Sequence, residues 1–384
     1  MADQALQLEQ DRRVVLTLDA GGTKLTFSAI AGNREVVDPI TLPACGDDLG
    51  ACLDQIVEGF SRVQRAAGAS PAAISFAFPG PADYPAGIIG DLANLPGFRG
   101  GVPLGPMLEE RFGVPVFINN DGDLFTYGEA LCGLLPEVNR WLAAAGSPKR
   151  FRNLLGVTLG TGFGGGVVSG GELYRGDNSA AGEIWLMRNK LDGDCCAEEG
   201  ASIRAVRRAY AHAAGLPLAA APEPKEIDAI AGGQAPGDAA AAREAFRRLG
   251  EVAGDAIANA LTLLDGLVVV GGGLAAAAPR FLPALVGQLN GRLQSLAGSD
   301  VPRLELTAFN LEDEAERRAF LAGRARTIAV PGSPRHAVYD PHKRTGIGVT
   351  RLGTSHAVAL GAYAYALRAL DSAAGTAGTA PSSP

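Results

Sequence analysis

Two glycine-rich turns, each set between apolar strands, constrain the fold of this chain more than any other feature. The first is DAGGTK, residues 19–24, which lies between the β-rich runs 14–18 and 25–30. The second is LGTGFGGG, residues 159–166, which also joins two apolar runs. A strand, a glycine turn and a second strand predict a β-hairpin. Strand and helix patterns alternate after both hairpins, so the sequence predicts an internal duplication of an α/β unit.

The remaining periodic segments predict buried strands and amphipathic helices. Short apolar runs bounded by Gly, Pro or polar residues predict strands within 34–44, 72–80, 114–120 and 266–271. Helical spacing of apolar residues predicts helices over 50–67, 123–134, 200–215, 239–264 and 279–296. Residues 215–240 are rich in Ala, Pro and Gly and predict a loop around one short helix. The tail after residue 371 has low complexity and is expected to be disordered.

Composition excludes several classes of protein. The chain has 384 residues, 47% of them hydrophobic, and a formal net charge of −7, so a basic nucleic-acid-binding face is not expected. No apolar run reaches the roughly 18 residues of a membrane helix, and the first residues lack the apolar core of a signal peptide. Five scattered cysteines do not suggest a disulfide framework. These features predict a cytoplasmic protein without membrane or nucleic-acid partners.

The two glycine turns are candidates for binding phosphate. Glycine lets backbone N–H groups approach an oxyanion, and Thr23 and Thr161 add hydroxyl donors. Asp19 ends an apolar strand, where its carboxylate can hold Mg²⁺ directly or through water. Neither turn is a Walker A loop, and GTGFGG precedes a strand instead of the helix that a dinucleotide-binding motif requires. The alternative is that both turns are simply hairpin tips.

The segment INNDGD, residues 118–123, places four polar side chains where a buried strand gives way to a helix: Asn119, Asn120, Asp121 and Asp123. A carboxylate at such a position can accept the proton of a substrate hydroxyl during phosphoryl transfer. Asn and Asp are also the preferred helix N-cap residues. Capping explains one of the four residues, and both roles can coexist.

The ordered motifs LDAGGTK, NNDGD…GEA, LGTGFGGG, GDNSAAGE and VVVGGG resemble those of the ROK family of bacterial sugar kinases and related repressors. The resemblance extends over about residues 13–370. It implies an α/β, two-lobed actin-like ATPase (ribonuclease H-like) fold with duplicated mixed β-sheets and a cleft between the lobes. The expected domains are an extension (1–12), a small lobe (13–121, completed by a helix at about 356–371), a large lobe (122–355) and the tail (372–384).

The resemblance also implies roles for individual residues. Asp121 would be the catalytic base, and Asn94, Asn120, Glu183 and Glu198 would bind the sugar. The phosphates of ATP would lie against the two glycine turns, with Mg²⁺ held at Asp19, possibly through water. The residues implied to bind ATP are Asp19, Gly21, Gly22, Thr23, Lys24, Gly160, Thr161, Gly162, Gly271, Gly272 and Gly273, the last three near the adenosine.

The chain departs from the family after Glu183. Family members have Gly-His and a three-cysteine knuckle that binds structural zinc, whereas this chain has Trp185 and Leu186 and only the adjacent Cys195 and Cys196. Two ligands are too few for a structural zinc site, so we expect no zinc and two half-buried thiols. The lost histidine leaves the identity of the sugar open. Trp185 can stack on the sugar or, as we expect, pack into the space of the missing metal.

Segment 303–350 is longer than the family leads one to expect. Its basic residues Lys343 and Arg344 are candidates for contacting a phosphate, but we expect them to lie in a solvated loop.

The interpretation favoured by these observations is an ATP- and Mg²⁺-dependent hexose kinase acting on the 6-hydroxyl of a glucose-like sugar, in a homodimer or homotetramer. A repressor would need a DNA-binding segment before the first strand, and 13 residues precede Val14. A sugar-binding regulatory protein without turnover is the remaining alternative.

Overall fold

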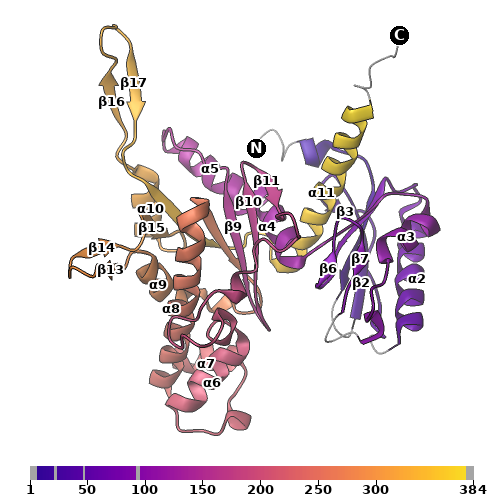
Figure 1. Cartoon of the computed structure of the whole chain (residues 1–384), viewed down its shortest axis with the longest axis horizontal. Coiled ribbons are helices and arrows are strands. Elements are labelled where there is room, and N and C mark those ends of the chain that lie inside the picture. The colour runs from indigo at the N-terminus through magenta and orange to yellow at the C-terminus, as the bar shows by residue number, and fades with distance from the viewer. Residues whose placement is uncertain (1–6, 21–23, 46–47, 92–95, 378–384) are drawn as a thin grey trace. The chain divides into compact units, whose positions relative to one another are not determined.

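The computed structural model describes residues 7–20, 24–45, 48–91 and 96–377, and its packing divides the chain into two units (Figure 1). Unit 1 consists of Met1–Gly133, Glu172–Ala181 and Leu352–Pro384, and unit 2 of Leu134–Gly171 and Gly182–Arg351. The sequence predicts a domain boundary between residues 121 and 122, whereas the packing divides the chain at Gly133 and Leu134. The helix that begins at Asp121 therefore belongs to unit 1.

Unit 1 is built on a mixed sheet in the order β3-β2-β1-β5-β8, with β4 paired to β2. Strand β1 runs antiparallel to β2, as the glycine turn between them predicts, and parallel to β5. The strands of this sheet are β1 (Val15–Ala20), β2 (Lys24–Ala31), β3 (Arg34–Glu35), β4 (Ile40–Pro43), β5 (Ala73–Ala77) and β8 (Val116–Asn119). A small hairpin, β6 (Ala82–Asp83) and β7 (Ile88–Ile89), lies outside it.

Helices cover both faces of this sheet because its strands bury both sets of alternating side chains. Leu16 and Leu18 pack on one side against α2 (Leu49–Ala67) and α3 (Leu104–Phe112), whereas Val15 packs on the other side against α11 (Thr354–Ala377). Helix α11 also packs against α4 (Asp121–Leu131). The 3-10 turn η1 (Pro96–Phe98) buries Phe98 in the same core as Leu16 and Leu18.

The contact between α4 and α11 depends on two glycines. A Cβ atom on Gly128 would lie 2.0 Å from the carbonyl oxygen of Ala357, and one on Gly361 would lie 2.0 Å from that of Leu124. Only glycine permits so close an approach of two helix backbones. The C-terminal helix thereby supports the helix that carries Asp121.

Unit 2 repeats the strand pattern of unit 1. Its sheet contains the order β10-β9-β12-β18-β15, in which β9 is antiparallel to β10 and parallel to β12. These strands are β9 (Leu154–Leu159), β10 (Phe163–Ser169), β12 (Leu267–Gly271), β15 (Thr307–Asn310) and β18 (Arg344–Val349). The predicted duplication is confirmed, because in each unit one strand pairs antiparallel with the next strand and parallel with a later one. Strand β11 (Glu172–Tyr174) follows in the segment assigned to unit 1.

The longest helix of unit 2 is α8 (Ala239–Leu264), which has the predicted bounds. The others are α5 (Leu134–Ala144), α6 (Ile203–Ala213), α7 (Pro224–Ala231), α9 (Ala278–Leu289) and α10 (Glu314–Ala322), with 3-10 turns η2 (Ile184–Leu186), η3 (Ala197–Glu199), η4 (Leu218–Ala220) and η5 (Ala275–Ala277). The helix predicted over 279–296 is too long, because the chain turns at Gly291 into a strand. In the described part of the chain, no helix combines the length and apolarity needed to cross a membrane.

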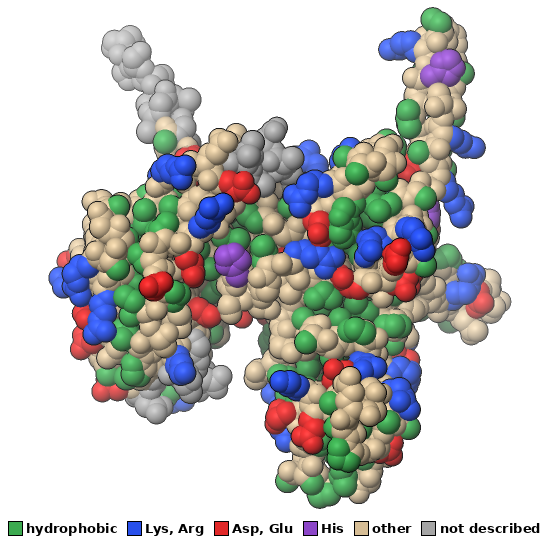
Figure 2. All heavy atoms as spheres, turned by 180° about the vertical axis from the view of Figure 1, so that it is seen from behind, with side chains coloured by type: hydrophobic (Ala, Val, Ile, Leu, Met, Phe, Trp, Pro, Cys, Tyr) green, Lys and Arg blue, Asp and Glu red, His purple; other side chains and the backbone are tan. Residues whose placement is uncertain are grey.

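Two hairpins of unit 2 extend from its surface. The first consists of β13 (Arg292–Gln294) and β14 (Asp300–Pro302), and the second of β16 (Arg326–Ala329) and β17 (His336–Tyr339). All residues of these four strands are exposed. Figure 2 shows basic side chains along the projecting second hairpin.

The expectation of a solvated loop over 303–350 is wrong, because this segment supplies β15, α10 and β18. The side chain of Arg344 is fully buried and forms an ion pair of 2.6 Å with Asp340. It also donates to the carbonyl of Phe320, at 2.6 Å, and lies over the ring of that residue. Lys343 is exposed and pairs with Glu305 at 3.6 Å. Arg344 therefore joins α10 to the sheet and is not available to a phosphate.

Removing the partner of Arg344 is expected to destabilise the protein strongly. Asp340→Ala leaves a buried guanidinium without its counter-charge, which costs about 3–5 kcal/mol of the free energy of unfolding. Glu305→Ala removes the partner of the neighbouring exposed Lys343 and should cost no more than about 1 kcal/mol. Urea unfolding of both variants measures the difference, and equal stability of the two would contradict the structural role of the buried pair.

Candidate functional site

The first glycine turn lies at the end of strand β1 in unit 1. Asp19 is exposed there and is opposite Thr26 in the β1–β2 ladder, and Lys24 begins β2 with an exposed side chain. Gly21, Gly22 and Thr23 lie outside the described residues, as does Asn94. The structure thus describes the strand residues on either side of the predicted phosphate turn.

Helix α4 begins directly beyond strand β8, so its first turn lies at the same edge of the sheet. Asn120 is the N-cap, and its side-chain oxygen accepts from the backbone N–H of Gly122 at 2.8 Å. An oxygen of Asp121 accepts from the same N–H group at 2.9 Å. The capping role of Asn120 is confirmed. Capping uses only one polar atom of Asn120, and the carboxylate of Asp121 keeps further lone pairs for a substrate.

The environment of Asp121 raises the pKa of its carboxyl group. The side chain is exposed to solvent, yet desolvation by the surrounding protein raises the pKa, and the hydrogen bonds from the backbone N–H groups of Gly122 and Asp121 oppose that shift. The nearby carboxylate of Asp19 raises the pKa further. Asp19 and Asp121 are therefore close enough to interact electrostatically. A carboxylate with a raised pKa is a stronger base.

Sequence reasoning missed two residues around this helix start. Arg175 donates to the side-chain oxygen of the buried Asn119 at 3.2 Å, and its guanidinium lies over the ring of Tyr365. The hydroxyl of Tyr84 donates to the carbonyl of Phe78 at 2.9 Å and lies 3.5 Å from the side-chain nitrogen of Asn120. The arginine beside the GDN motif was a visible signal, whereas nothing in the sequence pointed to Tyr84.

In unit 2 the second glycine turn meets the triple-glycine loop. The N–H of Leu274 donates to the carbonyl of Leu159 at 2.9 Å, and a Cβ on Gly160 would lie 3.8 Å from the nitrogen of Gly273. A Cβ on Gly273 would meet no atom within 4 Å. The structure therefore brings together Gly160–Gly162 and Gly271–Gly273, the two loops predicted to hold ATP, and leaves open space beside their backbones.

Glu198 lies against the same glycine turn. One of its oxygens accepts from the backbone N–H of Phe163 at 3.1 Å, and a Cβ on Gly162 would come within 2.6 Å of that oxygen. The other oxygen forms an ion pair of 3.0 Å with Arg204. Glu198 is thus fixed by a backbone donor and a cation beside the predicted phosphate turn.

Glu183 lies at the start of η2, where it accepts a hydrogen bond from the indole N–H of Trp185. The expectation that Trp185 packs into the space of a missing metal is wrong, because 36% of its surface is exposed. Leu186 is exposed as well. Trp185 therefore lies beside Glu183 at the surface, and its N–H orients that carboxylate.

The shortened knuckle is a hydrogen-bonded loop. The buried side chain of Asn189 accepts from the N–H groups of Leu191 and Asp192, at 2.9 and 3.2 Å, and the N–H of Asn189 donates to Cys195. Cys195 and Cys196 are both partly buried, as predicted. Among the described residues, no three metal-ligating side chains converge on one point. The hydrogen bond to Asp192 raises the pKa of the Cys195 thiol, so that thiol is not activated.

The duplicated hairpin sheets, with polar residues and glycine turns at the ends of their first strands, define the class of actin-like ATPases. Within that class the chain belongs to the ROK family, because the sequence model of that family matches residues 15–317.

Named relatives agree with this assignment. The chain is 53% identical to the glucokinase of Parabacteroides distasonis, whose crystal structure has a TM-score of 0.87, with 94% of this chain and 99% of that one covered. It is 31% identical to the N-acetyl-D-glucosamine kinase of Vibrio parahaemolyticus over 67% of this chain and 83% of the relative. The ROK hexokinase of Thermus thermophilus is 25% identical, with a TM-score of 0.65 and coverage of 93% and 99%.

The contact between the two glycine loops gives a prediction. Gly272 has a φ of +87°, and a Cβ there would lie 2.3 Å from the carbonyl oxygen of Leu159. Gly272→Ala therefore combines backbone strain with overpacking and is expected to lower the free energy of unfolding by about 2–4 kcal/mol. Gly273→Ala, with open space around it, should change stability by less than about 1 kcal/mol. Thermal and urea unfolding test this difference, and a Gly272→Ala protein as stable as wild type would refute the predicted contact.

Proposed function

We propose that this chain phosphorylates the 6-hydroxyl of a glucose-like hexose with ATP, and that Asp121 is the general base. Sugar phosphorylation by ATP is the common activity of the relatives named above, and the larger identity is to a glucokinase. The observation that carries the proposal is the carboxyl group of Asp121, which has a raised pKa and lies at a helix start beside Asp19. An N-acetylated hexosamine is the second candidate substrate, favoured by the relative in Vibrio.

The described residues fit a bound Mg·ATP. Gly160 and Gly273 border open space, and the exposed Thr161 adds a hydroxyl donor. We assign the phosphates and adenosine of ATP to the two loops Gly160–Gly162 and Gly271–Gly273. The first glycine turn, with Gly21, Gly22, Thr23 and Lys24, is proposed as a further contact for the phosphates. Mg²⁺, bound at Asp19 directly or through water, would neutralise charge on the phosphates.

The proposed sugar ligands are carboxylates and carboxamides whose positions are already set. Glu198 is held by Phe163 N–H and Arg204, and Glu183 by Trp185. Asn120 retains part of its carboxamide beyond the cap. Such groups accept or donate pairs of hydrogen bonds to neighbouring hydroxyls, and a sugar that lacks one hydroxyl leaves a polar group unpaired. Asn94 is proposed as a further ligand on the family resemblance alone.

In the proposed reaction, Asp121 hydrogen-bonds the 6-hydroxyl and takes its proton as the oxygen attacks the terminal phosphorus in line. The bond from that phosphorus to the bridging oxygen breaks, and ADP leaves with the bridging oxygen. The raised pKa strengthens the base, while the carboxylate stays ionised above that pKa. The N–H of Gly122 holds one carboxylate oxygen and leaves the other for the substrate. The oligomeric state and the cytoplasmic location stay predictions from the sequence.

The base assignment is tested with Asp121→Asn. Loss of the base is expected to lower kcat by about 10²–10⁴-fold. For wild type, kcat/KM should fall as the pH drops through the pKa of Asp121, since only the ionised form accepts a proton. Because that pKa is raised, the acid limb should lie above the ordinary aspartate value of about 3.9, and the variant should lose this limb. ADP release across glucose, mannose, fructose, allose and N-acetyl hexosamines measures these rates.

Asp54→Asn, the same change at an exposed position of α2, is the control and should leave kcat unchanged. A dehydrogenase specific for the 6-phosphate identifies the position of transfer. Equal rates for wild type and Asp121→Asn would show that Asp121 is not the general base. Tight sugar binding by wild type without ADP release would instead favour a regulatory protein without turnover.

The contact between Trp185 and Glu183 gives a separate prediction. Trp185→Phe keeps an aromatic ring but removes the N–H donor, so Glu183 is less well positioned for the sugar. KM for the sugar is expected to rise roughly tenfold, the worth of a hydrogen bond to a charged group, with a smaller change in kcat. Leu186→Ala, in the same 3-10 turn, should leave KM near wild type. An unchanged KM in Trp185→Phe would show that this hydrogen bond does not serve substrate binding.

A further inference from the structure

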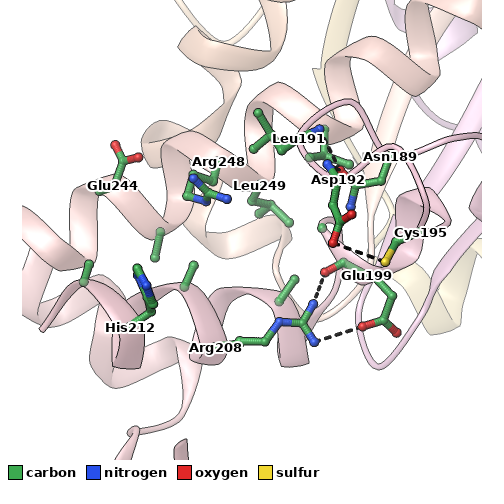
Figure 3. Close-up of a pocket in the computed structure, with 16 residues that line it drawn as sticks. Asn189, Leu191, Asp192, Cys195, Glu199, Arg208, His212, Glu244, Arg248 and Leu249 are labelled. Atoms are coloured by element: carbon green, nitrogen blue, oxygen red, sulfur yellow. Dashed lines mark hydrogen bonds and ion pairs between the residues drawn. The ribbon is translucent and has the colours of Figure 1, made fainter. Parts of the chain in front are cut away.

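A separate pocket lies in unit 2 between helices α6 and α8 and is closed at one end by the loop of residues 189–200 (Figure 3). Its volume of about 600 Å³ is in the range of small-molecule sites. Helix α6 lines one side of the pocket with residues at helical spacing, and α8 lines the opposite side. The lining residues are Asn189, Leu191, Asp192, Cys195, Glu199, Gly200, Ala205, Arg208, Ala209, His212, Ala213, Glu244, Ala245, Arg248, Leu249 and Val252.

The side chains between the two helices are small or apolar. Ala205 and Ala245 are buried, and Leu249 and Val252 are also almost fully buried. Small side chains on facing helices leave room for a ligand, and the apolar surface they expose can pack against its carbon atoms. The pocket is therefore open because of its residue types, since larger residues at these positions would fill it.

The acidic side chains of the pocket already have partners. Glu199 pairs with Arg208 at 2.9 Å and with Arg204 at 3.0 Å. Glu244, which also lines the pocket, pairs with Arg247 at 2.6 Å. Asp192 lies at the loop end, where it accepts a hydrogen bond from the thiol of Cys195 (Figure 3). Glu244 lies one helical turn before Arg248 and interacts with it electrostatically, but its ion pair is with Arg247.

Two basic side chains lie at the other end of the pocket. Arg248 on α8 and His212 on α6 are exposed and form no hydrogen bond or ion pair with any residue that the structure describes. Both project between the helices in Figure 3. An arginine and an imidazole that face one space provide several N–H donors, and a guanidinium can hold a phosphate through two parallel hydrogen bonds.

We propose that this pocket binds a small phosphate monoester, with the phosphate on Arg248 and His212 and the organic part against the alanine-rich floor. The volume exceeds that of a phosphate ion and leaves room for an organic part. This site is distinct from the proposed catalytic residues, because neither cation is among them.

The pocket is linked to the sugar site through a chain of ion pairs. Arg208 lines the pocket and pairs with Glu199, which shares Arg204 with Glu198. A phosphate ester that draws Arg208 toward itself leaves Glu199 with Arg204 alone and pulls that arginine from Glu198. This regulatory consequence rests on the proposed function, and it predicts that the ligand raises KM for the sugar.

Binding is tested by calorimetry on the full chain with 3-phosphoglycerate, inorganic phosphate and glycerate. We expect saturable binding of 3-phosphoglycerate at one site per chain, weaker binding of inorganic phosphate, and none of glycerate. Arg248→Ala should weaken the binding roughly tenfold or more, the effect of losing a charge-assisted hydrogen bond. His212→Gln, which keeps one N–H donor, should weaken it less.

The control is Arg318→Ala, which removes an exposed arginine of α10 in the same unit and should leave the affinity unchanged. Equal binding by wild type and Arg248→Ala, no binding at all, or equal binding of glycerate would overturn the proposed site. Binding that leaves the sugar KM unaltered would overturn the regulatory link. Calorimetry needs no turnover, so failure of the kinase proposal is recognised separately, by the absence of ADP release.

Discussion

Each unit of the molecule depends on one central strand that pairs with its own hairpin partner and with a parallel strand from later in the chain. Strand β1 joins β2 to β5, and strand β9 joins β10 to β12. Parallel pairing places the carboxyl ends of these strands at one edge, where ligands of α/β sheets bind. Asp19 and Asp121 meet at that edge in unit 1, as do the two glycine loops in unit 2. The positions of the candidate residues therefore follow from strand pairing.

Around the second glycine turn, side-chain pairs hold the loop of residues 189–200 and the two carboxylates near it. Asn189 organises the shortened loop through backbone N–H groups, while Arg204 holds Glu198 and Trp185 orients Glu183. Glu198 is held both by Arg204 and by the backbone N–H of Phe163 in the glycine turn itself. The loop that positions Glu198 also closes the pocket between α6 and α8, and this shared loop underlies the proposed link between that pocket and Glu198.

Much of the fold was predictable because its patterns are local. The glycine turns indicated both hairpins, and the uninterrupted helical spacing of residues 239–264 gave the bounds of α8 correctly. The cap at Asn120 was visible for the same reason, since capping involves residues adjacent in sequence. Of the site, the sequence indicated the glycine loops and Asp121, whose roles remain proposals. It did not indicate Tyr84, and although Arg175 stands beside the GDN motif, its contacts were not predictable, because the contacts of both residues join positions far apart in the chain.

Arg344 shows why the burial of a charged side chain cannot be predicted from the charges beside it in the sequence. In sequence it stands beside Lys343 in a polar segment, and two adjacent cations predict a solvated surface. In the structure Lys343 precedes strand β18 and is exposed, whereas Arg344 begins that strand and is buried, where Asp340 and the carbonyl of Phe320 offset the cost of burying its charge. Burial of Arg344 thus requires α10 and the strand to be in place together. The two adjacent cations differ in environment because of tertiary partners that no local pattern reveals.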